Sequence, residues 1–523
     1  METPLTPLEF KRRTLKLFPA REAVVDRGRR WTYAQFFERT DRWSAALAAL
    51  GVGPGDRVAY IAPNTHAQLE SFYAVPQLGA VLVPINYRLA PEEWVYLLNH
   101  SGARVLCVHA DFLEAVDGIR AALTHVAHVV ALEGHREGWL DYEALVAAHA
   151  PEFPEAAVGE HDLLTINYTS GTTSRPKGVM ITHRNAWVNV VGVLMHLPLG
   201  VGERYLWTLP MFHANGWTFT WIVTAAGGVH VCLPKVEAGE VFRLLAAEQV
   251  SMLCAAPTVL IALAHAPADV RRTAPRGVRV ITAGAPPAAA TIETLEDELG
   301  WSVTQGYGLT ETSPFITIST LLPEHRDLDT AGRAAIKARQ GVELISSGDL
   351  RVVDESGQEV TADGATLGES VVRGNVVMAG YYEDPDATAA AMGGGWFHTG
   401  DAAVVHPDGY VEIRDRIKDV IISGGENISS VEVEALLLRH PAVREAGVVG
   451  LPDEKWGEAP HAFVVLKEGA ATTPDELRAF CRAHLAHFKT PHSFRFVDEL
   501  PKTATGKIQK YVLRGGRPGI SAQ

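Results

Sequence analysis

Short apolar runs alternate with amphipathic segments along most of this chain. Residues 56–64 (DRVAYIAPN) have the pattern of a strand that enters a loop, and residues 65–86 have that of a helix followed by a second strand. Residues 278–287 (VRVITAGAPP) form another buried strand pattern, which breaks into a glycine-proline turn. This alternation predicts an α/β architecture.

The pattern changes twice in the last third of the chain. Residues 348–412 alternate with period two between turn residues, which predicts a smaller sheet or β-barrel-like subdomain beside the main α/β body. Residues 416–523 contain a glycine turn followed by helix and strand patterns, which predicts a small α+β domain. A chain of 523 residues is too long for a single compact core. We therefore expect two domains, 1–415 and 416–523, with a hinge near 415–418.

The composition is that of a folded globular protein. Hydrophobic residues make up 47% of the chain and charged residues 21%, and the formal net charge is -14. The negative charge argues against a nucleic-acid partner. Residues 1–13 lack the apolar core of a signal peptide, and no apolar run reaches membrane-spanning length, so we expect no integral membrane segment.

Cysteine spacing argues against a structural zinc site. The four cysteines are scattered, and no pair has the spacing of metal ligands or of a redox motif: they are Cys107, Cys232, Cys254 and Cys481. Such usage is typical of a reducing compartment, and we expect a cytoplasmic protein.

A decapeptide, TSGTTSRPKG at residues 169–178, is the strongest local signal for chemistry. Its glycines and small hydroxyl residues allow backbone amides and hydroxyls to surround phosphate oxygens, and Lys177 adds positive charge. The order differs from a Walker loop, because no Gly-Lys-Ser/Thr enters a helix. An exposed surface loop of the same composition is the alternative, but the complete decapeptide behind a strand pattern favours a phosphate site.

Four further motifs follow in order: QGYGLTET (305–312), GWFHTGD (395–401), RDRIKDVIISGGENIS (414–429) and PKTATGK (501–507). With these five motifs the chain resembles, over nearly its whole length, the adenylate-forming superfamily of acyl-CoA synthetases, peptide-synthetase adenylation domains and luciferases. One departure is Ser174, where many members carry glycine. Serine is also small, so we expect the loop to keep its function.

The resemblance implies a large N-terminal AMP-binding domain, a small mobile C-terminal domain and an AMP-forming acyl-CoA synthetase reaction. A carboxylic acid and MgATP would give acyl-AMP and pyrophosphate, and coenzyme A would then take the acyl group. The implied small molecules are ATP, Mg²⁺, coenzyme A and the acid. Homodimers are common among similar proteins, so a homodimer is a further possibility.

The resemblance also implies a nucleotide site. Tyr307 would lie against the adenine, Asp401 and Arg416 would bind the ribose hydroxyls, and Thr310 would bond the α-phosphate. Glu311 would hold Mg²⁺, which prefers carboxylate and phosphate oxygens. The complete nucleotide-binding set is Thr169, Ser170, Gly171, Thr172, Thr173, Lys177, Gly284, Ala285, Pro286, Gln305, Gly306, Tyr307, Gly308, Asp401 and Arg416.

Lys507, in PKTATGK, is the first candidate for a catalytic residue, together with Glu311 and Thr310. Negative charge builds on the α-phosphate and on the departing pyrophosphate when the carboxylate attacks. A fixed ammonium that touches both acyl and phosphate oxygens stabilises that charge. Outside this motif, a lysine in a polar loop would be an ordinary solvated charge.

Lys418 matches the position of the family hinge, about which the C-terminal domain rotates between two poses. The rotation would deliver Lys507 first and the glycine turn second. Gly424 and Gly425 would then form the wall of a pantetheine tunnel. Lys489 could bind a CoA phosphate, although an exposed structural lysine is an equal alternative.

The acyl pocket is assigned to His213, Trp217 and Gly284. Residues 209–221 (LPMFHANGWTFTW) match the family segment that carries an aromatic gate, with His213 near the substrate carboxylate and Trp217 one helical turn further on. An aromatic-rich helix that only fills the core is the alternative for Trp217. The bulk of Trp217 favours a short- or medium-chain aliphatic acid or a compact aryl acid, while a swinging gate would admit longer chains.

Two other functions remain to be weighed against this prediction. An acyl-AMP ligase would load a carrier protein in trans, since no carrier domain follows Lys507. A non-enzymatic acyl- or nucleotide-binding protein would bind without releasing pyrophosphate, but the retained Glu311, Asp401, Arg416 and Lys507 argue against it. An oxidative, luciferase-type activity has no positive support in the sequence.

Overall fold

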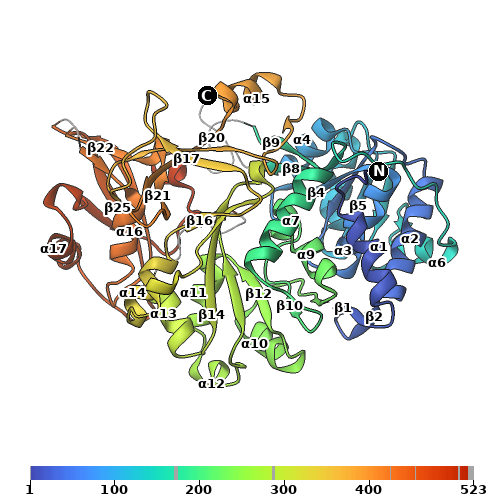
Figure 1. Ribbon diagram of the computed structural model, residues 1–523, viewed down its shortest axis with the longest axis horizontal. Coiled ribbons are helices and arrows are strands. Elements are labelled where there is room, and N and C mark those ends of the chain that lie inside the picture. The colour runs from blue at the N-terminus through green and yellow to red at the C-terminus, as the bar shows by residue number, and fades with distance from the viewer. Residues whose placement is uncertain are drawn as a thin grey trace.

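The structure, a computed structural model, describes residues 2–169, 175–284, 289–424, 426–453, 455–503 and 507–515. Two large sheets with helices around them form the main body, and a smaller sheet and a C-terminal domain follow (Figure 1). The expected mixed α/β class, with a large N-terminal part and a small C-terminal part, is confirmed.

The first large sheet has eight strands in the order β19-β9-β8-β4-β3-β5-β6-β7. Most neighbours are parallel, whereas β9 pairs antiparallel with both β8 and β19. Its strands are β3 (Arg57–Ile61), β4 (Val81–Ile85), β5 (Val105–Val108), β6 (His128–Ala131), β7 (Leu140–Asp141), β8 (Leu163–Thr169), β9 (Lys177–Thr182) and β19 (Gly380–Tyr381). Its helices include α2 (Tyr33–Ala49), α3 (His66–Ala74), α4 (Pro91–Ser101), α5 (Leu113–Ile119) and α6 (Tyr142–Ala148).

The second large sheet has nine strands in the order β16-β15-β14-β13-β12-β10-β11-β1-β2. Its strands are β1 (Glu22–Asp26), β2 (Arg29–Thr32), β10 (Arg204–Leu206), β11 (Val229–Val231), β12 (Met252–Ala255), β13 (Arg279–Thr282), β14 (Ser302–Gly308), β15 (Phe315–Ile318) and β16 (Val342–Glu343). Helices α1 (Leu8–Leu17), α7 (His183–His196), α9 (Phe219–Ala226), α10 (Ala238–Ala247), α11 (Pro257–Ala264), α12 (Ala268–Arg271), α13 (Ala289–Asp297) and α14 (Thr330–Lys337) belong to this part of the chain.

The main core lies where the helices of the two sheets meet. All nine residues of α3 are buried, so this helix has no solvent-facing side, and Thr65 caps its first turn by accepting a hydrogen bond from the Gln68 amide. Large side chains from the helices and strand ends of both parts fill the same cluster, including Trp43 of α2, Trp207 after β10 and Trp221 of α9. Burial of such aromatic rings is the largest apolar contribution per residue, so this cluster joins the two sheets into one body.

The small sheet is antiparallel, in the order β17-β18-β20-β21, and matches the period-two pattern of the sequence. Its strands are β17 (Asp349–Val353), β18 (Gly368–Arg373), β20 (Phe397–Val405) and β21 (Val411–Arg416), and α15 (Pro385–Ala391) precedes β20. The short 3-10 turn η7 (Ile417–Asp419) follows β21 directly and leads out of this sheet.

The C-terminal domain has its own five-stranded sheet and its own core (Figure 1). Its elements are β22 (Ile421–Ser423), β23 (Glu426–Ile428), α16 (Ser430–Leu437), β24 (Val443–Asp453), β25 (Gly457–Leu466), α17 (Pro474–His484), β26 (Ser493–Phe496) and α18 (Lys510–Leu513). Helix α17 begins with a capping box, in which Thr473 and Glu476 each bond the other's backbone amide. Among the described residues no helix is long and apolar enough to cross a membrane.

Candidate active site

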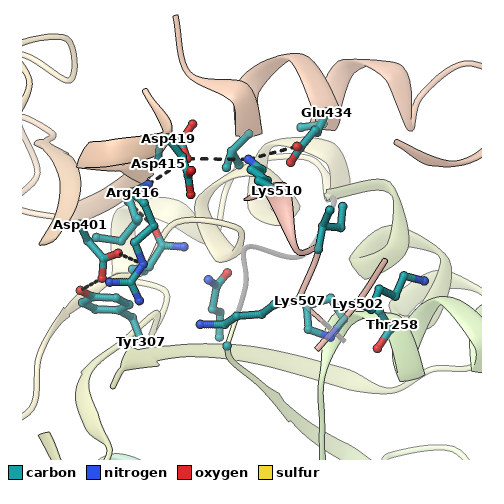
Figure 2. Close-up of a pocket in the computed structure, with 18 of the residues that line it drawn as sticks. Thr258, Tyr307, Asp401, Asp415, Arg416, Asp419, Glu434, Lys502, Lys507 and Lys510 are labelled. Atoms are coloured by element: carbon teal, nitrogen blue, oxygen red, sulfur yellow. Dashed lines mark hydrogen bonds and ion pairs between the residues drawn. The ribbon is translucent and has the colours of Figure 1, made fainter. Parts of the chain in front are cut away.

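A cavity of about 390 Å³ lies between the main body and the C-terminal domain. Its walls come from α11, the end of β14, strand β21, helix α16 and the segment before α18. Figure 2 shows charged side chains from both parts of the chain around this space. Residues that are remote in the sequence therefore share one pocket.

Strand β14 ends at the cavity with Gln305, Gly306, Tyr307 and Gly308, all of which line it. Glycine is required at position 308, because a Cβ there would lie 1.7 Å from the Pro314 carbonyl oxygen. The chain turns back tightly at this point through η4 (Thr310–Thr312) into the antiparallel neighbour β15.

Asp401, Arg416 and Tyr307 form one hydrogen-bonded group on the cavity wall (Figure 2). The Tyr307 hydroxyl donates to Asp401 Oδ2 at 2.6 Å, and Arg416 Nε lies 2.9 Å from Asp401 Oδ1. Asp401 and Arg416 are register partners on β20 and β21, so the sheet itself brings them together. Burial works against the charge of Arg416, but Asp401 and Tyr307 outweigh it and raise the pKa of the guanidinium.

Lys507 extends into the same cavity, on the side of Tyr307 (Figure 2). The pKa of its ammonium is lowered to about 8, mainly by burial and then by nearby Arg416, while Asp401 and Glu311 act in the opposite direction. The first catalytic candidate therefore lies within electrostatic reach of Asp401, Arg416 and Glu311.

Glu311 lies in η4, one residue after Thr310. The Tyr381 hydroxyl donates to Glu311 Oε1 at 3.0 Å, and within the described part of the chain Oε2 accepts no hydrogen bond. The described residues contain no group of three or more His, Cys, Asp or Glu that could hold a metal. A single carboxylate with one oxygen available fits Mg²⁺, which takes its remaining ligands from substrate phosphates and water.

The two ends of the phosphate loop lie side by side. Thr169 ends β8, and its register partner Lys177 begins β9. The Lys177 ammonium lies 4.7 Å from the centroid of the Tyr381 ring. Several predicted nucleotide and CoA residues lie outside the described residues: Ser170, Gly171, Thr172, Thr173, Ala285, Pro286 and Gly425.

The segment after His213 corrects an expectation. Trp217 does not follow His213 on a right-handed helical turn, because five consecutive residues have left-handed backbone angles, with φ from 36° to 63°. They are Ala214, Asn215, Gly216, Trp217 and Thr218. Four of the five are not glycine, and each such residue costs about 1–2 kcal/mol in this conformation.

Buried amide side chains hold this left-handed turn. Asn215 donates to Thr165 Oγ1 at 2.9 Å and accepts from Asn167 Nδ2 at 3.1 Å, so both of its amide ends are bonded to β8. Thr218 donates to Asn189 Oδ1 at 3.3 Å on α7. These partners lie 29 or more positions away in the sequence, which is why the local pattern predicts an ordinary helix instead.

The left-handed turn sets Trp217 against the nucleotide side of the site. The Trp217 ring meets Phe315 edge to face at 5.8 Å, and it lies 4.0 Å from the position of a Cβ on Gly284. The pKa of His213 is lowered to about 4, first by burial and then by the charges of Lys507 and Arg88. The structure thus brings the three acyl-pocket candidates toward Lys507, with His213 neutral at pH 7.

The CoA candidates lie elsewhere on the C-terminal domain. The Gly424 amide donates to the Trp456 carbonyl at 2.8 Å, and a Cβ on Gly424 would lie 2.7 Å from the Trp456 ring. Lys489 forms an ion pair with Glu432 at 2.7 Å. Neither Gly424 nor Lys489 is among the residues that line the cavity.

A charged group beside the hinge was not foreseen from the sequence. Lys510 lies 3.1 Å from Glu434 and 3.8 Å from Asp415, and it also donates to Ser430 (Figure 2). The Ser430 amide and hydroxyl both donate to Asp415. The charge-rich motif around position 415 is the one signal that could have suggested it.

The predicted hinge residue, Lys418, lies in η7 between the small sheet and the C-terminal sheet. It is exposed at the surface, and partial desolvation lowers the pKa of its ammonium, with Asp419 acting in the opposite direction. Arg514 donates to Asp419 at 2.7 Å, which ties the end of the chain to this turn.

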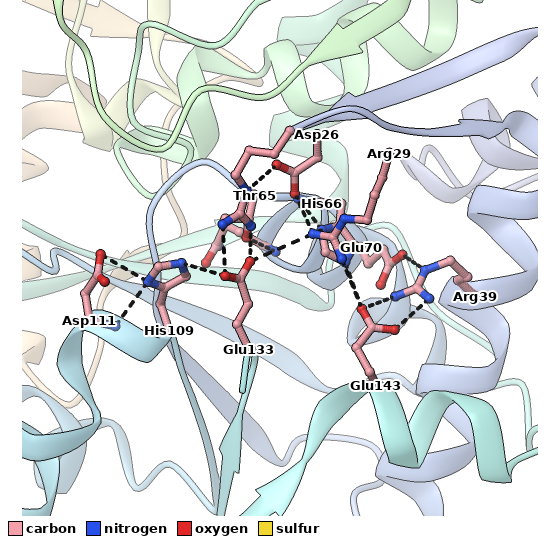
Figure 3. Close-up of polar contacts among 12 residues, drawn as sticks. Asp26, Arg29, Arg39, Thr65, His66, Glu70, His109, Asp111, Glu133 and Glu143 are labelled. Atoms are coloured by element: carbon pink, nitrogen blue, oxygen red, sulfur yellow. Dashed lines mark hydrogen bonds and ion pairs between the residues drawn. The ribbon is translucent and has the colours of Figure 1, made fainter. Parts of the chain in front are cut away.

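A second dense group of charges lies away from the cavity (Figure 3). His66 is fully buried between Asp26 and Glu143, with ring nitrogens 2.6 Å and 3.0 Å from their carboxylates. Arg39 pairs with Glu143 at 2.9 Å and with Glu70 at 2.7 Å. Because Asp26 belongs to β1 of one large sheet and His66 to α3 beside the other, the group joins the two sheets.

Two models of known protein families match this chain. Residues 11–382 match the model of the AMP-binding enzyme family, and residues 432–507 match that of the AMP-binding enzyme C-terminal domain. A 4-hydroxybutyrate–CoA ligase of Metallosphaera sedula is 41% identical, with 98% of this chain and 94% of that protein covered. An acetate/butyrate–CoA ligase of Arabidopsis thaliana, described as peroxisomal, is 42% identical with the same coverage.

A solved structure is also similar to this chain over nearly its whole length. The crystal structure of an anthranilate–CoA ligase in complex with anthranoyl-AMP superposes with a TM-score of 0.88 at 27% sequence identity. The alignment covers 98% of both chains, so the similarity includes the main body and the C-terminal domain.

Proposed function

The chain belongs to the AMP-binding enzyme family. On that premise, we propose that it uses ATP and Mg²⁺ to join a short-chain aliphatic acid to CoA. The reaction class is that of an ATP-dependent acid–thiol ligase, an acyl-CoA synthetase. The acid and ATP give acyl-AMP and pyrophosphate, and CoA then takes the acyl group and releases AMP.

The observation that carries the proposal is the meeting of Lys507 with the Asp401–Arg416 pair in one cavity, with Glu311 within electrostatic reach of the Lys507 ammonium. In the adenylation step the acid's carboxylate attacks the α-phosphate, and negative charge grows on the phosphate oxygens. Lys507 stabilises that charge with its ammonium, and preorganised electrostatic contacts of this kind are usually the largest contribution to catalysis. Asp401 and Arg416 bind the ribose hydroxyls and hold the nucleotide in line.

Glu311 is the residue that would hold Mg²⁺, with Thr310 beside it toward the α-phosphate. The bound ion would neutralise oxygens of the triphosphate. Lys177, at the start of β9, would add positive charge beside the same phosphates.

The substrate class follows from the acyl side of the site. Trp217 packs edge to face on Phe315 and lies beside Gly284, and its bulk there favours a short acyl chain. The two curated relatives act, by their names, on 4-hydroxybutyrate and on acetate or butyrate. His213, neutral at pH 7, orients the carboxylate and takes no part in proton transfer, because adenylation of a carboxylate needs no base.

CoA enters in a second pose of the C-terminal domain. With Lys507 in the cavity the present pose fits adenylation, and rotation about Lys418 would exchange Lys507 for the turn of Gly424 and Gly425. The two domains are then 1–415 and 416–523. Lys489 would meet a CoA phosphate only after release from Glu432. The names of the relatives favour CoA over a carrier protein as acceptor.

The proposal includes a cytoplasmic, homodimeric enzyme. All four cysteines are free and buried, which suits a reducing compartment. Light scattering of the purified protein would measure the oligomeric state.

The test of the function is an assay of the purified protein with MgATP, CoA and acids of two to eight carbons plus aryl acids. We expect acyl-CoA by mass spectrometry with the short aliphatic acids. Lys507→Ala should lower ATP–pyrophosphate exchange by roughly 10²- to 10³-fold, the usual cost of losing one transition-state contact.

Each other outcome has a definite meaning. Pyrophosphate release without acyl-CoA would replace CoA by a carrier-protein acceptor. Turnover restricted to aryl or long-chain acids would overturn the substrate class, and an unimpaired Lys507→Ala variant would overturn the assigned role of Lys507.

A further inference from the structure

Tyr381 connects two groups that the proposed function uses separately. Its hydroxyl donates to Glu311 Oε1 at 3.0 Å, and its ring lies 4.7 Å from the Lys177 ammonium. Tyr381 is buried, with 9% of its surface exposed. Glu311 follows β14 and Lys177 begins β9, so a single side chain touches residues from both large sheets.

The backbone fixes Tyr381 on both sides. The Tyr381 amide donates to Thr388 Oγ1 at 2.9 Å, and the next amide, of Tyr382, donates to the Gly178 carbonyl at 2.7 Å. The Met378 amide donates to the Glu311 carbonyl at 2.8 Å. The segment 378–382 therefore holds the main chain of Glu311 as well as its carboxylate.

The chemistry of the phenol suits a donor of fixed direction. A phenol is an O–H donor at neutral pH, so the Tyr381 hydroxyl presents its hydrogen to Glu311. This hydrogen bond to Oε1 fixes the orientation of the carboxylate and leaves Oε2 as an acceptor for another ligand. The electron-rich face of the Tyr381 ring attracts the ammonium of Lys177.

We infer that Tyr381 is a positioning residue that aims the Glu311 carboxylate at the divalent cation and the Lys177 ammonium at the phosphates of ATP. The inference rests on the proposed function, since it assigns Mg²⁺ to Glu311. A hydrogen-bond partner behind a metal ligand fixes its orientation, and its loss commonly lowers metal affinity roughly 10- to 100-fold.

Two variants of Tyr381 separate its two contacts. Tyr381→Phe keeps the ring beneath Lys177 and removes the hydroxyl, whereas Tyr381→Leu removes both. Tyr382→Phe is the matched control, because it removes the same hydroxyl one residue away, where the Tyr382 ring packs on His100 at 5.8 Å. Circular dichroism and thermal melting of each variant check that it is folded.

The first measurement is binding, without turnover. Mn²⁺ is titrated into enzyme with a non-hydrolysable ATP analogue and followed by electron paramagnetic resonance. We expect Tyr381→Phe to weaken Mn²⁺ binding roughly 10-fold and Tyr382→Phe to leave it unchanged. Metal-free binding of the analogue, measured by calorimetry, should weaken in Tyr381→Leu and not in Tyr381→Phe.

The second measurement is the Mg²⁺ dependence of ATP–pyrophosphate exchange. Tyr381→Phe should raise the Mg²⁺ concentration needed for half-maximal rate by a similar factor, while the rate at saturating Mg²⁺ stays near that of wild type. A merely structural role would lower the rate at all Mg²⁺ concentrations.

Glu311→Gln distinguishes failure of the inference from failure of the proposed function. Wild-type Mn²⁺ binding in Tyr381→Phe together with lost binding in Glu311→Gln would overturn the role of Tyr381 alone. Unchanged binding in both variants would overturn the assignment of the cation to Glu311 itself.

Discussion

At the scale of single residues, Lys507 holds its charge in a cavity that disfavours it. The pKa of the ammonium is lowered from 10.5 to about 8, mainly by burial and by Arg416. Because adenylation needs the ammonium, kcat/KM for ATP should fall as the pH rises through about 8, well below the range in which an exposed lysine titrates.

This pH profile can be checked with Lys507→Arg. The guanidinium stays charged throughout, so the fall above pH 8 should disappear even though the maximal rate is lower. The effect of the same pKa shift on stability has the opposite direction. Between pH 8 and 10.5 the unfolded chain binds more protons at Lys507 than the folded chain does. The contribution of Lys507 therefore makes the free energy of unfolding rise with pH. A profile that is identical in wild type and Lys507→Arg would contradict the prediction.

Among single residues, those inside the five motifs could be placed from the sequence. Asp401, Arg416 and Lys507 are far apart along the chain and meet in the cavity, and Glu311 lies within electrostatic reach of Lys507. Tyr381 and Lys510 lie outside the residues singled out, because their partners are set by β19 and α18, whose positions depend on tertiary pairing. A single tyrosine or lysine outside a motif has no sequence pattern that would distinguish it.

At the scale of elements, the left-handed turn 214–218 depends on Asn215. Asparagine tolerates this backbone conformation better than alanine, and its amide also bonds Thr165 and Asn167. Asn215→Gly loses the amide but keeps the backbone unstrained, whereas Asn215→Ala loses both. We expect Asn215→Ala to have the lower free energy of unfolding, by about 1 kcal/mol, in urea titrations.

The same two variants should differ in substrate choice. If the turn relaxes in Asn215→Ala, Trp217 leaves Phe315 and acids of six or eight carbons gain in kcat/KM relative to butyrate, while Asn215→Gly stays close to wild type. Equal stability and equal chain-length profiles in the two variants would show that the turn does not depend on backbone strain at Asn215.

Regular elements were the easiest to predict, and this turn was the hardest. Strands 56–64 and 278–287 follow from their own apolar patterns, because burial on a sheet is legible in a few consecutive residues. The turn is stabilised instead by side chains of β8 and α7. The aromatic and small residues of the turn are arranged as in a right-handed helix. The sequence pattern therefore predicts the wrong handedness for this turn.

At the scale of the whole molecule, Asp415 reaches across the proposed hinge. It ends the small sheet before Lys418, and its partners Ser430 and Lys510 come after it. Rotation about Lys418 would break these contacts. The Asp419–Arg514 pair lies entirely beyond Lys418 and would move as a unit.

Asp415→Asn should therefore favour the thioester-forming pose. We expect ATP–pyrophosphate exchange to slow several-fold, while CoA transfer from supplied acyl-AMP is unchanged or faster, since a loss of about 1–2 kcal/mol shifts an equilibrium by a factor of roughly 5–30. Arg514→Met is the control, because it removes an ion pair of the same region without crossing the hinge. Equal loss in both half-reactions would mean that Asp415 only supports the fold.

The order of motifs was sufficient to predict the architecture, since each motif belongs to a known part of the adenylate-forming fold. The pose of the C-terminal domain was not predictable. It depends on a balance of contacts such as Asp415 with Lys510, and two poses of one sequence can differ by a few kcal/mol.

The separate core of the C-terminal domain also decides how Lys507 is supplied. A short connection, 417–420, joins this domain to the small sheet, so in the proposed reaction Lys507 would meet the nucleotide as a tethered group. Short flexible tethers give effective concentrations in the millimolar range. The same domain added as a free fragment at micromolar concentration would leave the site of a truncated main body almost always empty. The covalent connection between the domains would therefore keep Lys507 at its proposed catalytic position. The contacts between the two domains would not need to be strong, so they could break and re-form in every reaction cycle.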